Sequence, residues 1–178
     1  MTEADFPLLS LIITIPLLGA LLAGSIRNVD VAKQIAFFTA LITFVLTACA
    51  TLLFDADKSG FQLVERYDWI PLLKIEYLVG VDGISVLFLP MTGLLTIITM
   101  LASWSAISHS SRFHFSLLLA LESVSIGVFC ALDTVLFFLF WELTLPPFFF
   151  LIGLWGIGSQ RRSAAMKYTL FMLAGGVT

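Results

Sequence analysis

A single acidic residue, Glu142, lies inside an apolar run (residues 134–158) that is long enough to cross a membrane. A carboxylate at bilayer depth costs roughly 2.5–3.5 kcal/mol even on the lenient insertion scale, so an acid there is a functional candidate. Pro146 and Pro147 follow it, and neither proline has an N–H to donate to the carbonyls of Glu142 and Leu143. We therefore predict that the helix opens beside Glu142, and that this acid faces protein or a wet cavity rather than lipid.

The composition indicates a polytopic helical membrane protein. The 178 residues are 60% hydrophobic and 12% charged, with a mean hydropathy of +1.05. Several apolar runs approach the roughly 20 residues that span a hydrocarbon core of about 30 Å. We predict an all-α transmembrane bundle that forms a single membrane domain over residues 1–178. The predicted spans are residues 7–26, 31–54, 84–107, 113–131 and 134–154, and a sixth span begins at residue 164.

The sixth apolar run is shorter than the others. From residue 164 to Thr178 it provides about fifteen residues, or roughly 22 Å of helix, which is less than a full crossing. We therefore expect a following segment or another polypeptide to supply further helices.

The distribution of Lys and Arg between the loops predicts the orientation of the chain. With the N-terminus outside, six of these residues lie in inner loops and three in outer segments. Because inner loops carry an excess of Lys and Arg, we predict an outside N-terminus. The six inner residues are Arg27, Lys33, Arg112, Arg161, Arg162 and Lys167, and the three outer residues are Lys58, Arg66 and Lys74.

The segment between the second and third spans, residues 55–82, is the only sizeable one outside the predicted membrane helices. Residues 61–70 alternate in part between apolar and polar side chains, and Pro71 separates them from residues 72–79. Two short alternating runs around a turn residue are typical of a β-hairpin. We predict a short extracytoplasmic hairpin here.

A second acid, Glu122, matches Glu142 in predicted depth. Glu122 lies ten residues before the turn at Leu132 and Asp133, and Glu142 lies nine residues after that turn. Both acids are therefore about 15 Å deep, near the middle of the bilayer. Burial favours the neutral form of a carboxyl, and two nearby acids disfavour ionising both, which suits groups that take up and release protons. The alternative is that each acid only hydrogen-bonds between helices and has no role in transport.

Other side chains extend this picture. A stripe of small residues on the fourth predicted helix lets another helix approach closely, and Glu122 lies beside it and is expected to point into the bundle. Lys167 is a candidate third relay residue, although it also acts with its neighbours as a topology determinant. His109 and His114 flank a basic residue at the inner surface, where simple solvation is favoured over a role in proton collection. The stripe is Ser116, Ala120, Ser123 and Gly127.

The motifs of a self-contained enzyme are missing from the sequence. It has no Gly-rich phosphate loop, and no Cys or His cluster suited to haem, iron–sulfur or zinc. Cys49 and Cys130 lie in apolar spans without metal-ligand spacing, so we predict that both are small buried hydrophobic residues. We expect no cofactor or metal site in this chain and no nucleic-acid partner, and we expect the redox centres of any associated oxidoreductase to lie in other subunits.

Three stretches of the sequence resemble a known family. The resemblance is to the antiporter-like subunit M of bacterial proton-pumping NADH:quinone oxidoreductase, respiratory complex I, and it extends from about Leu8 onward. The sister subunits L and N share the fold, but the motifs in this sequence are most similar to those of subunit M. The stretches are GVDGIS (residues 80–85), ALDTVLFFLFWELTLPPFFFLIGLWG (131–156) and RRSAAMKYTLFMLAGG (161–176).

The resemblance implies the N-terminal part of an antiporter-like fold in a multi-pass protein of the bacterial inner (plasma) membrane. Glu142 matches the family's fifth-helix glutamate and Glu122 its fourth-helix glutamate, and the family pairs the former with a lysine on the seventh helix. The implied partners are other membrane-arm subunits of the L and N types, the lipid bilayer, and a segment or chain that supplies the remaining helices. NADH, FMN, iron–sulfur clusters and quinone are expected in partner subunits. Pro147 departs from the family, where a single proline is more usual.

Three functions remain open from the sequence. The first is a proton-translocating part of complex I or of a related membrane-bound hydrogenase. The second is part of a multisubunit cation/proton antiporter, which uses the same fold without redox partners. The third is a membrane scaffold fragment that transports nothing.

Overall fold

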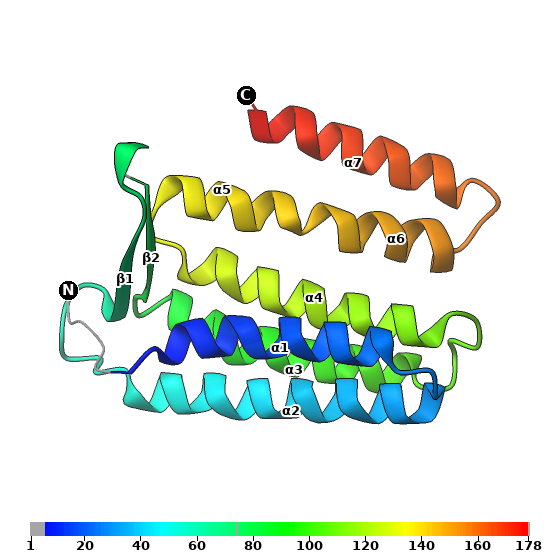
Figure 1. The fold of residues 1–178 in the computed structure, drawn as a ribbon, viewed down its shortest axis with the longest axis horizontal. Helices are drawn as coiled ribbons and strands as arrows, with labels where there is room; N and C mark the ends of the chain where they lie inside the picture. The colour runs from blue at the N-terminus through cyan, green and yellow to red at the C-terminus, as the bar shows by residue number, and fades with distance from the viewer. Residues whose placement is uncertain (1–5, 74, 178) are drawn as a thin grey trace.

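The computed structural model describes residues 6–73 and 75–177, which form a helical bundle with one small sheet (Figure 1). Five of its segments are long and apolar enough to cross a membrane: α1, α2, α3, α4, and α5 together with α6. The predicted polytopic transmembrane bundle is confirmed. In chain order the elements are α1 (Leu8–Ser25), α2 (Val29–Leu53), β1 (Gln62–Ile70), the 3-10 helix η1 (Pro71–Leu73), β2 (Ile75–Val81), α3 (Ser85–Ser103), α4 (Ser111–Cys130), α5 (Thr134–Leu143), α6 (Leu145–Trp155) and α7 (Arg161–Val177).

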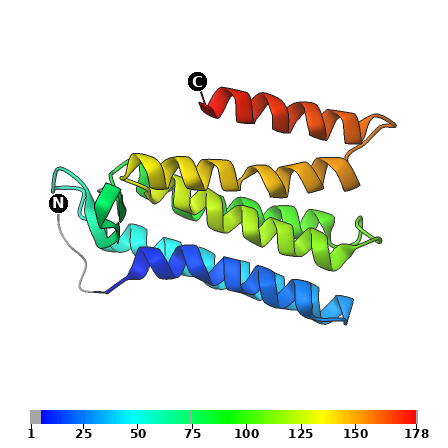
Figure 2. The same cartoon turned by 45° about the horizontal axis from the view of Figure 1, so that its top comes forward.

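The helices run side by side in layers. Helices α1 to α4 pack against one another, and α5 and α6 lie along α4 (Figure 1). Helix α7 is outermost and packs against α6 and α5, as the turned view also shows (Figure 2). The helix that contains the predicted sixth span begins at Arg161, three residues before the predicted start of that span.

The small residues of α4 allow it to lie close to α1. The hydroxyl of Ser123 donates a 2.6 Å hydrogen bond to the carbonyl of Ile13, and that of Ser116 donates one of 2.6 Å to the carbonyl of Ala20. Hydrogen bonds between helices are available only where the backbones approach closely. The largest buried cluster continues from this contact to the hairpin, and includes Leu9, Ile12, Val79, Val81, Ile126 and Cys130.

The predicted hairpin is confirmed. Strands β1 and β2 are antiparallel, with Tyr67 opposite Tyr77 and Glu65 opposite Val79, and the pairing shifts register at two places. The second strand begins at Ile75 because η1 occupies the residues after the turn proline. Lys74, one of the three cations predicted to lie in outer segments, is outside the described residues.

The hairpin is joined to the first helix by Glu65, whose side chain is 4% exposed. Its carboxylate accepts hydrogen bonds from the backbone N–H groups of Leu9, at 2.6 Å, and Ser10, at 3.1 Å, and from the Ser10 hydroxyl. Helix α1 follows Pro7, which has no side chain that could cap these N–H groups. The role of Glu65 was not predicted from the sequence, although the absence of a capping side chain at Pro7 was a signal that a distant acceptor is needed.

At the end of the bundle opposite the hairpin, basic side chains cap the C-terminal carbonyl groups of two helices. Lys33 donates a 2.7 Å hydrogen bond to the carbonyl of Trp104, which follows α3, and its ammonium lies 5.9 Å from the Trp104 ring centroid. Arg112 donates a 3.0 Å hydrogen bond to the carbonyl of Ile26, which follows α1. Cations at helix C-termini satisfy free carbonyls and complement the helix dipole. These two residues therefore have structural roles besides their effect on topology.

Candidate proton-transfer site

The fifth span is interrupted beside Glu142. Helix α5 ends at Leu143 and α6 begins at Leu145, with Thr144 between them. The Thr144 N–H bonds to the carbonyl of Trp141 at 3.2 Å, which is a tighter turn than the α-helical pattern. Pro146 and Pro147 occupy the first turn of α6, where the missing N–H groups are tolerated. The break leaves the backbone around Glu142 without the regular ladder of hydrogen bonds.

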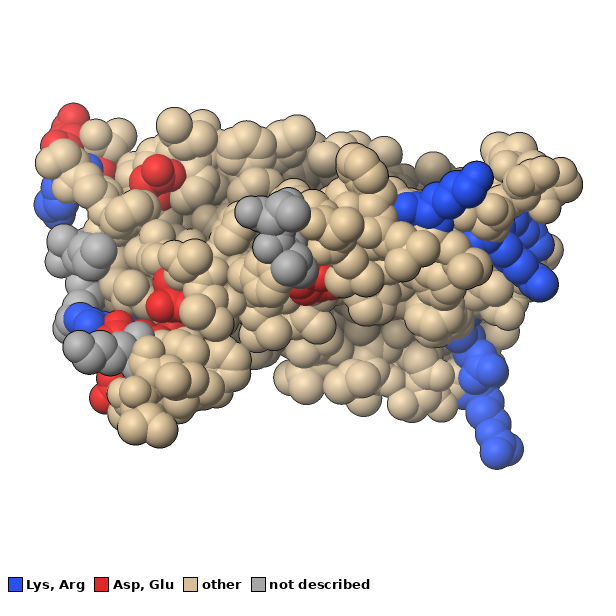
Figure 3. All heavy atoms as spheres, turned by 90° about the horizontal axis from the view of Figure 1, so that it is seen from above, with Lys and Arg blue, Asp and Glu red and all other residues tan. Residues whose placement is uncertain are grey.

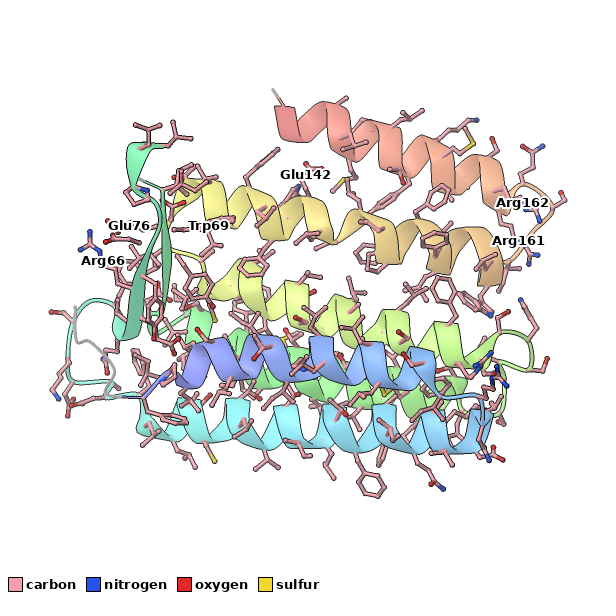
Figure 4. The ribbon with its side chains drawn as sticks, viewed as in Figure 1. Arg66, Trp69, Glu76, Glu142, Arg161 and Arg162 are labelled. Atoms are coloured by element: carbon pink, nitrogen blue, oxygen red, sulfur yellow. The ribbon has the colours of Figure 1, made fainter. Side chains whose placement is uncertain are left out.

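Glu142 points from α5 toward α7 (Figure 4). Its Oε1 atom is buried and has no hydrogen-bond partner among the described residues. Directly opposite is Gly176, where an added Cβ would overlap that oxygen and would lie 3.4 Å from the Phe138 ring. Any side chain at position 176 would therefore require the carboxyl group of Glu142 to shift. Gly176 lies in the third stretch that resembles the family, but no role for it was predicted from the sequence.

Glu122 is more deeply enclosed, with 1% of the residue exposed. Neither carboxyl oxygen has a hydrogen-bond partner in the described part of the chain. Its side chain lines a groove of about 420 Å³ between α3 and α4. The groove also carries hydroxyl groups, from Thr92, Thr96, Thr99 and Ser125. The hydroxyl groups of the three threonines donate to carbonyls of their own helix, and their oxygens can still accept a hydrogen bond from water.

The two acids face different neighbours. Glu122 lines the groove between α3 and α4, whereas Glu142 meets α7. No hydrogen bond joins them, and no Lys or Arg that the structure describes forms an ion pair with either. Lys167 is exposed and precedes Gly176 by nine residues, or about 14 Å along the helix. The structure thus does not bring Lys167 to Glu142.

A second groove lies between α4, the α5–α6 break and α7. Its volume is about 220 Å³, and its polar lining comes from Ser125, Thr144 and Tyr168. Ser125 and Phe129 line both this groove and the one that contains Glu122. The side of α4 that bears Ser125 therefore lines both the groove that contains Glu122 and this second groove. Thr144, which lines the second groove, is two residues from Glu142 along the chain.

The two histidines, which were both predicted to be solvated, differ in exposure. His109 is exposed, but His114 is 7% exposed, and neither of its ring nitrogens has a hydrogen-bond partner within the described ranges. The His114 ring packs edge-on against Trp155, with centroids 4.8 Å apart. The expectation of solvation was wrong for His114, because the first turn of α4 lies under the end of α6.

The two cysteines differ in burial. Cys130 is buried as predicted, whereas Cys49 is exposed on the outer side of α2, contrary to the prediction. The difference arises because α2 buries a stripe of Ala and Thr residues and turns this cysteine away from it. Across residues 6–73 and 75–177, no group of three or more His, Cys, Asp or Glu side chains could hold a metal ion.

The fold is that of a polytopic membrane protein, and comparisons with known proteins relate it to antiporter-like membrane subunits. A family described as "NADH:quinone oxidoreductase/Mrp antiporter, TM" matches residues 131–178, which include the helix break and α7. The structure of the membrane-bound sulfane sulfur reductase, an archaeal respiratory membrane complex, contains a chain that superposes with a TM-score of 0.76 at 23% identity. That match covers 96% of this chain and 26% of the other, and it shows a shared fold.

Relatives of higher sequence identity show which type of subunit the chain resembles. The chain is 37% identical over 173 residues to NAD(P)H-quinone oxidoreductase chain 4 of Prochlorococcus marinus, covering 95% of this chain and 32% of the relative. It is 36% identical over 165 residues to F(420)H(2) dehydrogenase subunit M of Methanosarcina mazei, covering 93% and 33% respectively. The chain therefore spans about a third of the length of these relatives. The predicted resemblance to the M-type (chain 4) subunit is confirmed.

Proposed function

We propose that this chain is part of a proton-translocating membrane-arm subunit of a redox-driven NADH:quinone oxidoreductase, with Glu142 and Glu122 as proton-relay carboxylates. The observation that carries the proposal is Glu142, an acid with an unpaired buried oxygen at a break in a membrane-spanning segment. An ionised acid without a partner at this depth costs several kcal/mol. A neutral carboxyl avoids this cost, and a nearby cation or water stabilises the ionised form.

In this proposal a lysine from a helix outside this chain pairs with Glu142. Its approach stabilises the carboxylate, and its withdrawal favours proton uptake. The unpaired Oε1 atom and the absence of an ion pair to any described Lys or Arg support this arrangement. Water in the two grooves that share Ser125 would carry the proton between Glu122 and Glu142. Lys167 has a lesser role at the inner surface, in line with its exposure.

The surrounding assembly follows from the same proposal. NADH, FMN, iron–sulfur clusters and quinone bind to partner subunits, and membrane-arm subunits of the L and N types flank this one. The protein lies in a bacterial inner membrane, with its N-terminus and hairpin outside and Arg161 and Arg162 inside. The excess of basic residues at the α6–α7 end supports this orientation.

The decisive experiment replaces Glu142 in the assembled complex. We expect Glu142→Gln to lower proton pumping and coupled quinone reduction roughly tenfold or more, because a proton-exchanging group is lost. Glu142→Asp should keep part of the activity, since the carboxyl survives one methylene shorter. Glu76→Gln, an equivalent change at an ion pair in the hairpin, is the control. Normal pumping in Glu142→Gln would rule out the relay.

A cation/proton antiporter is the second candidate, because the matching family includes Mrp antiporters. Vesicles that contain the native assembly separate the two functions. NADH-driven acidification supports the redox pump, whereas proton movement driven by a sodium gradient without NADH supports the exchanger. If neither Glu142→Gln nor Glu122→Gln changes the activity that the native assembly shows, the chain is a scaffold.

The orientation has its own test. A single cysteine at Ser59, in a background without Cys49 and Cys130, is treated with an impermeant thiol reagent. Labelling from the outer face is expected, and labelling only from the cytoplasmic face would reverse the proposed topology.

A further inference from the structure

A third groove lies between α6 and α7, at the end of the bundle where the turn connects them. Its volume is about 250 Å³, and its lining is almost entirely apolar. The helices approach closely at its floor, where a Cβ added to Gly153 would lie 3.6 Å from that of Ala165. The walls are formed by Phe149, Phe150, Leu154 and Met166, and Arg162 lies at the rim. The groove therefore combines an apolar interior with a cation at one end.

The charge around this rim is entirely positive. Residues 145–177 contain Arg161, Arg162 and Lys167 but no Asp or Glu. None of these three side chains forms a hydrogen bond or ion pair with another described residue. Figure 4 places Arg161 and Arg162 at the turn between α6 and α7, and Figure 3 shows Lys and Arg side chains gathered at this end. Two guanidinium groups are thus available to an anion.

The N-terminus of α7 also favours an anion at this end of the groove. Helix α7 begins at Arg161, so its first N–H groups and the positive end of its dipole lie beside the two arginines. From the end of α6 the groove reaches back to Phe149, six residues or about 9 Å into the membrane layer. An apolar slot of this depth below a basic rim matches a phospholipid whose headgroup remains at the surface.

We propose that this groove binds one anionic phospholipid of the inner leaflet. Its phosphate contacts Arg161 and Arg162, and the upper part of one acyl chain lies between Phe150 and Met166. Arginine suits this role because its fork of N–H donors matches phosphate oxygens. The site is separate from Glu142 and Glu122, so the proposal does not depend on the function of those acids.

The test uses the protein in its native assembly, reconstituted into vesicles. The probes are phosphatidylglycerol and phosphatidylcholine, each with a photoreactive group in the upper acyl chain, and adducts are mapped by peptide mass spectrometry. We expect phosphatidylglycerol to label residues 149–166 roughly tenfold more than phosphatidylcholine, because two arginines favour the anionic headgroup. Free inorganic phosphate should not compete, since it has no chain to fill the groove.

Variants separate the two parts of the site. The double variant Arg161→Gln/Arg162→Gln should reduce phosphatidylglycerol labelling to the phosphatidylcholine level. Met166→Trp fills the groove and should reduce labelling by both probes. Arg27→Gln, a basic residue at the α1–α2 turn, is the matched control and should change neither.

Two results would overturn the proposal. One is equal labelling of residues 149–166 by both probes, unaffected by the double arginine variant. The other is absence of lipid adducts there together with a cross-link from Met166→Cys to another helix, which would show that protein covers the groove. If Met166→Trp does not assemble, the double arginine variant, whose changes lie at the surface, still decides the outcome.

Discussion

The carboxylate of Glu65 accepts a 2.6 Å hydrogen bond from the backbone N–H of Leu9, across 56 residues of sequence. This bond joins the hairpin to the first turn of α1 and supplies the acceptor that Pro7 cannot provide. A negative charge at a helix N-terminus is also favoured by the helix dipole. One buried acid therefore holds the hairpin against the first turn of α1.

Replacing Glu65 should destabilise the protein measurably. Glu65→Ala leaves one buried N–H group, of Leu9, and one partly buried N–H group, of Ser10, without an acceptor. Hydrogen bonds to a charged group are worth about 1.5–3 kcal/mol each. We expect the free energy of unfolding to fall by about 2–4 kcal/mol, measured by denaturant titration in detergent micelles. Glu65→Gln should cost less because its amide oxygen still accepts. Glu76→Ala, which removes a hairpin ion pair, should cost about 1 kcal/mol or less; an equal loss in both variants would contradict the capping role.

Ser123 and Ser125 provide a matched pair on α4. Ser123 donates a buried 2.6 Å hydrogen bond to Ile13, whereas the Ser125 hydroxyl has no hydrogen-bond partner among the described residues. Ser123→Ala should reduce stability by about 0.6–1.7 kcal/mol, since hydrogen bonds between membrane helices average about 0.6 kcal/mol and reach about 1.7 kcal/mol. Ser125→Ala should change it by about 0.5 kcal/mol or less. Thermal unfolding of the two variants in one detergent gives the comparison, and a larger loss for Ser125→Ala would show that the α1–α4 bond is not the stronger contact.

Gly176 controls the space available to Glu142. Gly176→Ala places a methyl group on Oε1 of Glu142, so the acid must move, whereas a methyl group at Gly175 meets no atom within 4 Å. Both changes improve helix propensity by about 1 kcal/mol, so propensity cancels in the comparison. We expect Gly176→Ala to slow proton translocation several-fold and Gly175→Ala to leave it near the native rate, measured with a pH-sensitive dye in vesicles. Equal rates in the two variants would mean that the position of Glu142 is not limiting.

Asp82 should make stability depend on pH. Its carboxylate accepts hydrogen bonds from the N–H groups of Ser85, at 2.6 Å, and Ile84, at 3.1 Å. The Ser85 backbone bond is the main cause of a pKa below the ordinary value of 3.8. A lowered folded-state pKa contributes stability above pH 3.8, and that contribution is lost as the pH falls through the folded value.

Asp82→Ala should therefore cost about 1 kcal/mol at pH 7, and the difference from the native protein should shrink below pH 3.8. Unfolding in detergent at several pH values measures this. The control is Asp68→Ala, whose side chain is exposed in β1 and makes no hydrogen bond to a described residue. A constant difference across the pH range would exclude the lowered pKa as its source.

Much of the architecture follows from local sequence features. The length of each apolar run predicts a spanning helix, because the bilayer core sets how many residues a crossing needs. The alternation around Pro71 predicts the hairpin, and Pro146 with Pro147 predicts the opening near Glu142, because a missing N–H acts on the same helix four residues away. These effects depend only on neighbouring residues, so they can be predicted from the sequence.

Other features depend on which helices become neighbours. The sequence placed Glu122 and Glu142 at one depth but could not tell that the first would line the α3–α4 groove and the second would meet Gly176 on α7. The solvation expected for His114 was wrong for the same reason, since Trp155 reaches it from another helix. Burial on a membrane helix is decided by the rotation of that helix against its partners, which the apolar run does not encode.

The amino-acid sequence by itself determined the membrane class, the approximate spans, the hairpin and the two acids as candidates. The tertiary structure alone decided that Glu65 completes α1, that Gly176 makes room for Glu142, and that an apolar groove lies beneath Arg162. The physical reason is the distance along the chain over which each effect acts. Hydropathy and proline act within one helix, whereas caps, close approaches and grooves arise between segments that packing brings together from far apart in the chain.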